Sequence, residues 1–432
     1  MDQTEALIIE TIDRHREEIL EFARDIYSHA ELGYKEFQTS GKFVKKMEQL
    51  GLRTEKGFAI TGVKAYLNED KKENASLALL GELDALRIPE HAFANPETNA
   101  AHCCGHHAQM AGVFGAALAL TVPEIAEKLD GQVVFFATPA EEYGEIEFKN
   151  QLREQGKIRY GGGKCELLRI GAFDDIDLCL THHIRPGNEI LVGSGTGNGF
   201  VSKVIRVLGK ASHAAGAPEK GVNALSAVSL GLQALGLNRE TFRDEDCVRV
   251  HPIITKGGNL VNVIPDEVVV ETLVRGKTIE AFTDAAKKTD RSFKAGAIAM
   301  GAKVEISTLP GYLPTLAEEA LPELKHAAEI SASGIPVIEA SGHAGGSTDV
   351  GDVQHLMPVY TFNTGGVKGG LHQIDFEVTD EEEAYIVTAK MFALAAYGLL
   401  KEKAQRSREL VDQYEPVFKN SAEYVELSLI HI

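Results

Sequence analysis

The strongest constraint on the fold is a set of three apolar segments, each followed closely by acidic residues or histidines. The segments cover residues 76–80, 132–138 and 175–180 and have the composition of buried strands. The residues that follow them are Glu82 and Asp84, Glu141 and Glu142, and His182 and His183. Parallel strands of an open α/β sheet end at a common edge, where such proteins bind ligands, so we expect these side chains to form one site. The predicted fold class is α/β, with a mostly parallel central sheet flanked by helices.

These charged residues also allow a simpler interpretation. Glu82 and Asp84 could cap a helix, and Glu141 and Glu142 could be solvated loop residues. A carboxylate at the end of a buried strand is costly unless it is paired or faces a metal. Two adjacent carboxylates repel each other unless they have different roles, such as cation ligand and base.

The stretch from His102 to His107 places two cysteines and three histidines within six residues, just before an apolar, helix-like segment. Cys104 and His106 flank Gly105, which permits a sharp turn and lets a thiolate and an imidazole reach one centre. This density of ligand types indicates metal binding. Two alternatives stay open, namely a redox pair formed by the adjacent cysteines and a cysteine that is a small buried hydrophobe.

Length, charge and cysteine content limit the class of protein. A chain of 432 residues exceeds the usual size of one core, so two domains are expected. The net charge of −19 argues against nucleic acid or an anionic membrane as a partner. Five cysteines without a disulfide pattern, a polar N-terminus and no apolar run long enough for a bilayer favour a soluble cytoplasmic protein.

The hydrophobic pattern changes at about residue 196. From there the order strand, helix, strand, strand, helix, strand predicts a four-stranded, two-helix α+β domain inserted at 196–308. Its strands are expected near 201–207, 248–255, 267–275 and 303–307, and its helices at 221–237 and 279–300. The flanking parts, 1–195 and 309–426, would form the catalytic domain. Residues 427–432 spell the translation of a common sequencing-adapter end, so we treat them as a non-native tail.

Other segments are assigned from periodicity and composition. Helices are expected at 5–28, 39–50 and 379–400, and strands at 336–338 and 358–362. Residues 143–160 are highly charged, so this segment is predicted to lie on the surface, outside the core of the domain. Gly161 to Lys164 read as a loop, because the full glycine-rich phosphate-binding pattern is absent.

The order of eight motifs resembles the M-twenty family of metallopeptidases and amidohydrolases. They are GELDAL, HCCGH, TPAEE, HHIRPG, GKASHAAGAPEKGVNAL, NVIPD, GSTDVGDV and GGLH, within residues 15–400. The branch that the chain most resembles is the p-aminobenzoyl-glutamate hydrolase and β-alanyl dipeptidase type. The resemblance implies that the inserted domain is a lid and dimerisation domain, so a homodimer is expected.

The resemblance also implies a role for individual residues. The metal ligands would be Cys104, His106, Glu142, His183 and His372. Glu141 would be the general base, and Asp84 would support the metal site. His213 would reach a neighbouring subunit's site and stabilise the oxyanion. Asn262 and Arg275 would hold a substrate carboxylate.

Three positions depart from the family pattern. His107 stands where relatives usually have Asp or Asn, Gln109 where many have another His, and Glu82 where more distant relatives have a histidine. Two divalent ions are still expected, zinc or manganese, with cobalt as a further option.

The predicted function is hydrolysis of an amide bond. The expected substrates are small molecules, namely N-acyl, N-aroyl or dipeptide-like conjugates of amino acids. A bound divalent ion polarises the carbonyl and lowers the pKa of water to about 7, while Glu141 would take the proton. An aminopeptidase or dipeptidase of the same family is the alternative enzyme. A non-catalytic metal-binding relative is the alternative from another class, although it would not need an unligated base such as Glu141.

Overall fold

The computed structural model describes the chain from residue 1 to residue 430, with side chains through Glu426. The chain forms two compact units. The first comprises Met1–Gly195, Leu316–Gly342 and Asp352–Tyr424, and the second comprises Thr196–Thr315, His343–Gly351 and the residues from Val425. The predicted tail, 427–432, lies outside the residues whose side chains are described.

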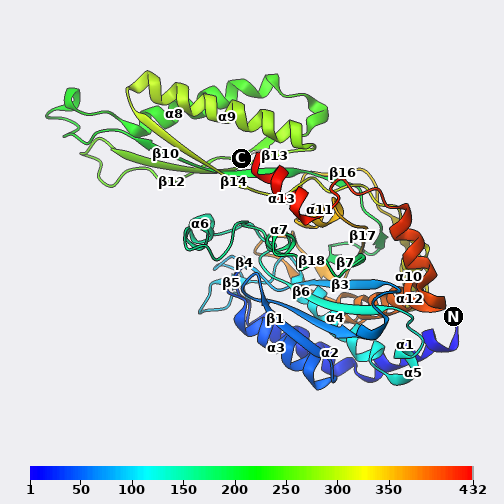
Figure 1. The fold of residues 1–432 in the computed structure, drawn as a ribbon. Coiled ribbons are helices and arrows are strands. Elements are labelled where there is room, and N and C mark those ends of the chain that lie inside the picture. Colours follow the sequence, from blue (N-terminus) through cyan, green and yellow to red (C-terminus); the bar gives the residue numbers. More distant parts are fainter. Residues whose placement is uncertain (431–432) are drawn as a thin grey trace. The chain divides into compact units, whose positions relative to one another are not determined.

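The first unit is built on an eight-stranded sheet in the order β1-β2-β6-β3-β7-β17-β8-β15 (Figure 1). The strands are β1 Arg53–Phe58, β2 Gly62–Leu67, β3 Ser76–Glu82, β6 Gln132–Thr138, β7 Leu178–Ile184, β8 Ile190–Val192, β15 Val337–Glu339 and β17 Val359–Thr364. Strand β3 runs parallel to β6 and β7, and β7 runs parallel to β17. β8 and β15 are also parallel to each other, whereas β1–β2, β2–β6 and β8–β17 are antiparallel. The α/β prediction with a mostly parallel sheet is confirmed.

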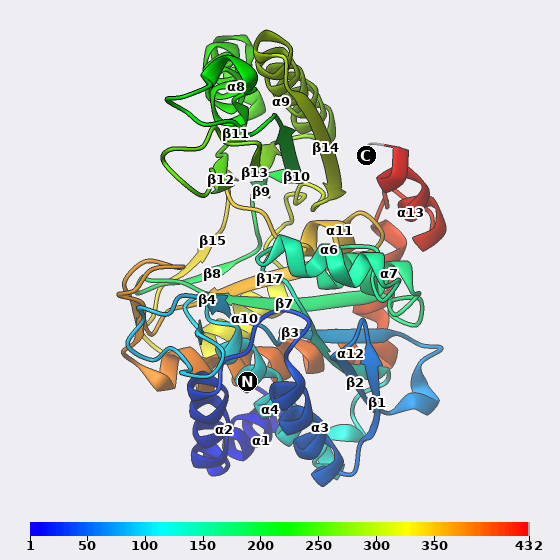
Figure 2. The same ribbon diagram turned by 90° about the vertical axis from the view of Figure 1, so that its left-hand side faces the viewer.

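Helices cover both faces of this sheet. They are α1 Gln3–Arg14, α2 Arg16–Ser28, α3 Phe37–Gln49, α4 His106–Leu120, α5 Pro123–Ala126, α6 Ile146–Glu154, α7 Gly163–Arg169, α10 Pro322–Ser331 and α12 Thr388–Gln413. α1 to α4 lie on one side, and α6 and α7 on the other (Figures 1 and 2). α4 is buried along its whole length and packs against β3 and α12, because its Ala, Gly and Leu residues leave no polar face. Two further helices are α11 Val350–Gln354 and α13 Ser421–Ile430, and in each of them the division between the two units falls within the helix.

Two helix predictions differ from the structure. The helix predicted at 5–28 is interrupted at His15, which ends α1 and precedes α2. The helix predicted at 379–400 begins as a π-helix, Glu382–Val387, and α12 continues to Gln413. α12 is bent at Lys401–Ala404, where three residues have positive φ.

Among the described residues, one helical stretch, Glu382–Gln413, is long and apolar enough to cross a membrane. However, 89% of its most apolar window is buried inside the protein. It packs against α4 and α10, so its apolar character is explained by the core of the first unit.

The second unit has a five-stranded antiparallel sheet in which β12 and β11 pair with β13, followed by β10 and β14. Its strands are β10 Gly199–Leu208, β11 Arg249–Val250, β12 Ile253–Lys256, β13 Glu267–Gly276 and β14 Lys303–Pro310. Helices α8 Ala224–Asn238 and α9 Ile279–Met300 pack on it around a separate apolar core. Short pairs complete the loops of the two units: β9 Thr196–Gly197 with β16 His343–Ala344, β4 Leu86–Arg87 with β5 Ala100–Ala101, and β18 Val367–Lys368 with β19 Glu377–Val378.

The prediction of four strands in this unit was wrong. The segment predicted as one strand at 248–255 is two short strands separated by His251 and Pro252. Proline has no backbone N–H to donate, so it interrupts the ladder at that point.

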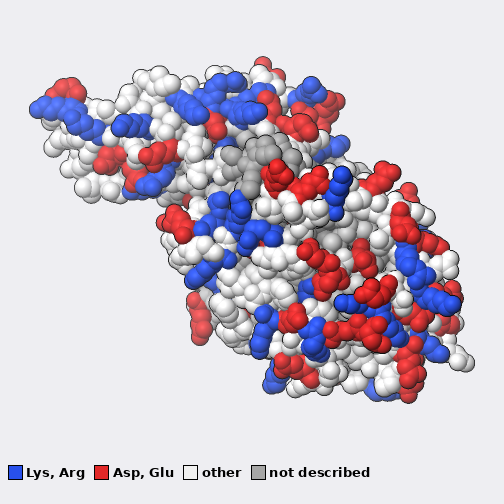
Figure 3. Space-filling view, in the orientation of Figure 1, with Lys and Arg blue, Asp and Glu red and all other residues white. Residues whose placement is uncertain are grey.

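On the face drawn in Figure 3, acidic and basic side chains are intermingled over both units.

Candidate metal centre

The predicted ligands meet because three neighbouring strands end at the same edge of the sheet. β3 lies between β6 and β7 and is parallel to both. Glu82 is the last residue of β3, and Glu141 and Glu142 follow the end of β6. His183 lies inside β7, next to its last residue, although the sequence suggested that it follows the strand.

Cys104 and His106 reach this edge from the start of α4. Gly105 precedes the helix with φ of +94°, a conformation that favours glycine. A Cβ at this position would lie 2.0 Å from Cγ2 of Ile184 at the end of β7. The glycine therefore lets the helix start approach β7 closely enough for Cys104 and His183 to meet.

Six of the predicted site residues and Glu82 form three overlapping groups in which the ligand atoms lie within 4.8 Å of one another. The groups are Cys104, His106 and His183; Cys104, Glu142 and His372; and Glu82, His106 and Glu141. The Cys104 Sγ lies 3.3 Å from His183 Nε2 and 3.2 Å from His372 Nε2. Cys104 thus belongs to two groups, as a ligand shared by two cations would.

Two of the histidines have their Nε2 atoms ready to bind a cation. His106 Nδ1 lies 2.9 Å from the Asp84 carbonyl oxygen, and His183 Nδ1 lies 2.8 Å from the Ile184 carbonyl oxygen. A carbonyl accepts, so Nδ1 carries a proton in each ring, and Nε2 is the nitrogen that a neutral ring offers to a cation. Metal-binding histidines are commonly fixed by this kind of contact.

His372 is held in place through its backbone. Its φ is +63°, in the left-handed region that non-glycine residues rarely adopt, and its N–H donates to the Cys103 carbonyl. Its Nε2 lies 3.1 Å from Glu142 Oε1. Backbone strain of this kind is typical of functional positions.

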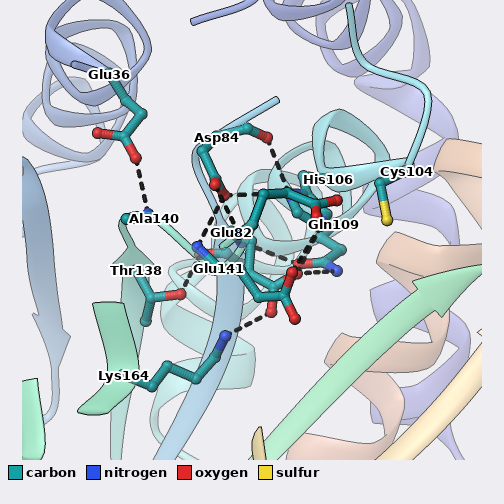
Figure 4. Close-up of polar contacts among 12 residues, drawn as sticks. Glu36, Glu82, Asp84, Cys104, His106, Gln109, Thr138, Ala140, Glu141 and Lys164 are labelled. Carbon is teal, nitrogen blue, oxygen red and sulfur yellow. Dashed lines mark hydrogen bonds and ion pairs between the residues drawn. The ribbon is translucent and has the colours of Figure 1, made fainter. Parts of the chain in front are cut away.

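Asp84 fixes the two adjacent glutamates. Its carboxylate accepts the backbone N–H groups of Glu141 and Glu142, at 3.1 and 2.9 Å. Next to them, Ala140 has φ of +49°, and its N–H donates to buried Glu36 (Figure 4). Asp84 therefore orients both the backbone that carries Glu141 and the ring of His106.

The ionisation of the group depends on a cation. Burial, together with the Glu142 carboxylate, raises the pKa of the Cys104 thiol well above its usual value. Burial lowers the pKa of His106, but the charge of Glu82 and the hydrogen bond to Asp84 outweigh it, so the pKa is raised well above its usual value. A thiolate and a neutral imidazole, the forms that bind metal, are thus favoured only when a cation supplies the positive charge.

The residues present fit a metal centre. His106 Nε2 and Glu142 Oε1 are buried, and each lies 3.1 Å from an atom of another candidate ligand, Glu82 Oε2 and His372 Nε2 respectively. One thiolate, carboxylates and imidazoles are the ligand types preferred by zinc and related divalent ions. The structure therefore brings the five predicted ligands together, and their role as ligands stays a prediction.

The other histidines near these residues face elsewhere. His107 is buried with Nε2 3.1 Å from the Tyr385 hydroxyl, and burial lowers its pKa to about 3. His182 Nε2 lies 2.8 Å from the Thr364 hydroxyl, and its ring packs against Phe362. The two histidines adjacent to ligands are thus parts of the core.

The three predicted lid residues lie in the second unit. His213 pairs with Val263 in a short antiparallel bridge, which places it beside Asn262, and both side chains are exposed. His213 Nδ1 accepts N–H groups from Ala215 and Gly216, so its Nε2 carries the proton. Arg275 lies on β13, and its Nη1 donates to the Ser347 hydroxyl.

Sequence reasoning missed the environment of Glu82. Lys164 was assigned to a loop, but it lies in the first turn of α7 and is fully buried, with Nζ 2.5 Å from Glu82 Oε1 (Figure 4). The glycines before it permit this, because a Cβ on Gly163 would lie 1.6 Å from the Pro139 carbonyl oxygen. An acidic residue at the end of a buried strand was the available signal, since it requires a partner.

The largely parallel sheet and its helices define an α/β protein. The thiol, carboxylates and imidazoles at the edge of the sheet form a candidate two-metal centre. The family model of peptidase family M20/M25/M40 matches residues 78–397, and the chain belongs to this family. The predicted family is confirmed, and the protein is a hydrolase of the amidohydrolase and metallopeptidase class.

Individual relatives cover most of the chain. It is 27% identical over 408 residues to Xaa-Arg dipeptidase of Mus musculus, covering 91% of this chain and 85% of the relative. It is 27% identical over 315 residues to one of the subunits of p-aminobenzoyl-glutamate hydrolase of Escherichia coli, covering 71% of this chain and 60% of the relative. The crystal structure of a Bacillus subtilis dinuclear metal binding peptidase from the M20 family matches with a TM-score of 0.62 and 24% identity, covering 90% of this chain and 99% of that one. This last likeness concerns the fold.

Proposed function

We propose that the protein is a two-metal amidohydrolase that releases an amino acid from an N-acyl, N-aroyl or dipeptide-like conjugate. The observation that carries this proposal is the shared position of Cys104 in two ligand groups, with Glu141 beside them. Cys104, His106 and His183 would hold one divalent ion, and Cys104, Glu142 and His372 the other. Zinc or manganese is proposed, with cobalt as an option, because the ligand set is borderline in softness.

Divalent ions at these positions would polarise an amide carbonyl and lower the pKa of water to about 7. Glu141 is the general base in this proposal, because it lies next to the ligands and one of its oxygens is 3.9 Å from His106 Nε2. It would take a proton at its carboxylate and pass it to the leaving nitrogen. Asp84 positions Glu141 by holding the backbone N–H of that residue.

Residues of the second unit would bind the substrate. An arginine recognises a carboxylate through two parallel hydrogen bonds, so Arg275, with Asn262, would select substrates that carry an α-carboxylate. The protonated Nε2 of His213 would donate to the developing oxyanion. We propose that this unit is a lid, and that it pairs two chains in a homodimer in which His213 serves the neighbouring site.

Dipeptide hydrolysis is a specific second candidate, supported by the likeness to a dipeptidase over 91% of the chain. The two candidates share the metal centre and differ in whether the substrate has a free amine. We also propose a cytoplasmic location, because all five cysteines, each within the described residues, are free thiols.

The test is a substrate screen with defined metals. Protein loaded in turn with zinc, manganese and cobalt is offered acyl-glutamate, acyl-aspartate, p-aminobenzoyl-glutamate, β-alanyl and Xaa-Arg conjugates, and amino acid release is measured. Hydrolysis that requires metal and a free α-carboxylate is expected. Binding of two ions per chain without cleavage of any of these amides would contradict the proposal and favour a metal-binding relative.

A further inference from the structure

Glu82 is a buried carboxylate whose orientation is fixed from two sides. Lys164 Nζ lies 2.5 Å from Glu82 Oε1, and Gln109 Nε2 donates to Glu82 Oε2 at 2.8 Å. The backbone N–H of Glu82 donates to Gln109 Oε1 at 2.9 Å, so the Gln109 amide contacts Glu82 through both of its polar atoms. Figure 4 shows Lys164 and Gln109 directed at this carboxylate. All three side chains are buried.

The same carboxylate faces the lone pair of a proposed metal ligand. Glu82 Oε2 lies 3.1 Å from His106 Nε2, while the Asp84 carbonyl oxygen accepts the proton on Nδ1 of the same ring. In that tautomer, two electron-rich atoms face each other in a buried space. Such an arrangement is stable only when an electrophile, a proton or a metal ion, lies between them.

The distance agrees with two ligands on one cation. Metal bonds to histidine nitrogen and carboxylate oxygen are about 2.0–2.2 Å long, so neighbouring ligand atoms lie roughly 2.8–3.6 Å apart. Lys164 contacts the other oxygen of Glu82, and Oε2 accepts one hydrogen bond from Gln109, so a second lone pair of Oε2 serves this contact. Glu82, His106 and Glu141 also form one of the three groups of possible ligands.

We propose that Glu82 is a further carboxylate ligand of the cation bound by His106, and that Lys164 and Gln109 are positioning residues for it. The inference rests on the proposed function, because it adds a ligand to the same metal centre. Lys164 balances the charge of Glu82, so the extra ligand leaves the net charge of the centre unchanged.

The competing explanation is purely structural. In that case the ion pair of Lys164 and Glu82 fastens α7 to β3 and has no contact with a cation. Removing both charges together would then change stability but not metal binding. A variant that removes one charge alone is unsuitable, because it leaves the other buried and unpaired.

The test is metal binding by the double variant Glu82→Gln/Lys164→Met. Its matched control is Lys64→Met/Asp175→Asn, which removes another ion pair of a buried lysine, on β2 of the same sheet. Folding is verified by circular dichroism, and zinc and cobalt affinities are measured in metal buffers with elemental analysis. Visible absorption of the cobalt protein reports sulfur ligation through charge transfer and the coordination number through ligand-field bands.

We expect the double variant to keep the sulfur charge-transfer band, to bind one of its two ions about 10-fold to 100-fold more weakly, and to show altered ligand-field bands. The control should match the wild type in all three. Unchanged affinities and an unchanged cobalt spectrum in a folded double variant would overturn the inference. If the double variant does not fold, Glu82→Asp keeps the charge but withdraws the carboxylate, and unchanged affinity for both ions would overturn the inference equally. Wild-type protein that binds no metal would instead contradict the proposed function.

Discussion

His372 Nε2 lies 3.2 Å from Cys104 Sγ, although 268 residues separate them in the chain. The backbone N–H of His372 donates to the carbonyl of Cys103, so the loop that carries the histidine is tied to the stretch that carries the cysteine. The candidate centre is therefore complete only when both flanking parts of the first unit have folded together.

Replacing Cys104 with serine should reduce metal content. The Sγ is close to both His183 and His372, and a hydroxyl is a much poorer ligand than a thiolate for zinc or cobalt. We expect fewer ions per chain by elemental analysis and loss of the sulfur charge-transfer band in the cobalt protein. Wild-type metal content in this variant would remove Cys104 from the ligand set, and Cys165→Ser, at another buried cysteine, is the control.

Replacing Glu141 with glutamine should separate binding from catalysis. Glutamine keeps the size of the side chain but cannot take a proton, so kcat should fall by about 10²-fold to 10⁴-fold while both ions stay bound. Turnover and metal content are measured on the same sample. Turnover near that of the wild type would reject Glu141 as the base.

Replacing Gly105 with alanine should destabilise the protein. The φ of +94° is unfavourable for alanine, and its Cβ would overlap Ile184 Cγ2. We expect a loss of roughly 2–5 kcal/mol in the free energy of unfolding by urea titration.

A second glycine provides the control for this prediction. Gly41 lies within α3, and no atom lies within 4 Å of the position that an added Cβ would take, so Gly41→Ala should stabilise by about 0.4–1 kcal/mol. Adding Ile184→Ala to Gly105→Ala should recover part of the loss, because it removes Cγ2. An equal effect of both glycine substitutions would contradict the steric argument.

Glu36 should make stability depend on pH. Burial, followed by the charge of Asp84, raises the pKa of Glu36 to about 7. The folded protein therefore binds this proton more tightly than the unfolded chain does. The contribution is fully present below the unfolded pKa near 4.5 and is lost as the pH rises through about 7, by up to about 3 kcal/mol.

Glu36→Gln tests this contribution, because the amide resembles the protonated acid and can still accept the Ala140 N–H. Urea unfolding of wild type and variant is compared between pH 5 and pH 8 at constant metal content. The variant should lose less stability over this range than the wild type. Parallel curves for the two proteins would show that Glu36 does not titrate there.

Mixing two inactive variants should reveal a shared active site. His213→Ala should lower activity by about 10²-fold or more if it removes an oxyanion donor, and Glu141→Gln lacks the base. Mixed dimers would contain one site with an intact base and an intact partner histidine. Partial recovery of activity is expected, and no recovery after verified subunit exchange would place His213 at its own chain's site.

The arrangement of strand ends was predictable because parallel strands bring distant residues to one edge. Apolar segments before Glu82, Glu141 and His183 were sufficient to place all three on that edge. His107 and His182 look identical to their neighbours in the sequence. Only packing shows that they contact Tyr385 and Thr364 rather than the ligand group.

Lys164 was not predictable by the same reasoning. A lysine after three glycines has the composition of an exposed loop, and its burial depends on how closely Gly163 approaches Pro139. The split of the strand at 248–255 was a local misjudgement, since Pro252 was visible in the sequence. Close backbone contacts between segments distant in the chain are set by tertiary packing, which a local pattern does not contain.

Cys104 belongs to two ligand groups, so both groups depend on the chemical state of one sulfur atom. Oxidation of a thiol to sulfinic acid is irreversible in most proteins and replaces a soft donor with a bulky, hard one. A single such lesion at Cys104 would remove a donor from both groups at once. Peroxide damage at this atom should therefore inactivate the protein in one step, without a partly active form that retains one intact group.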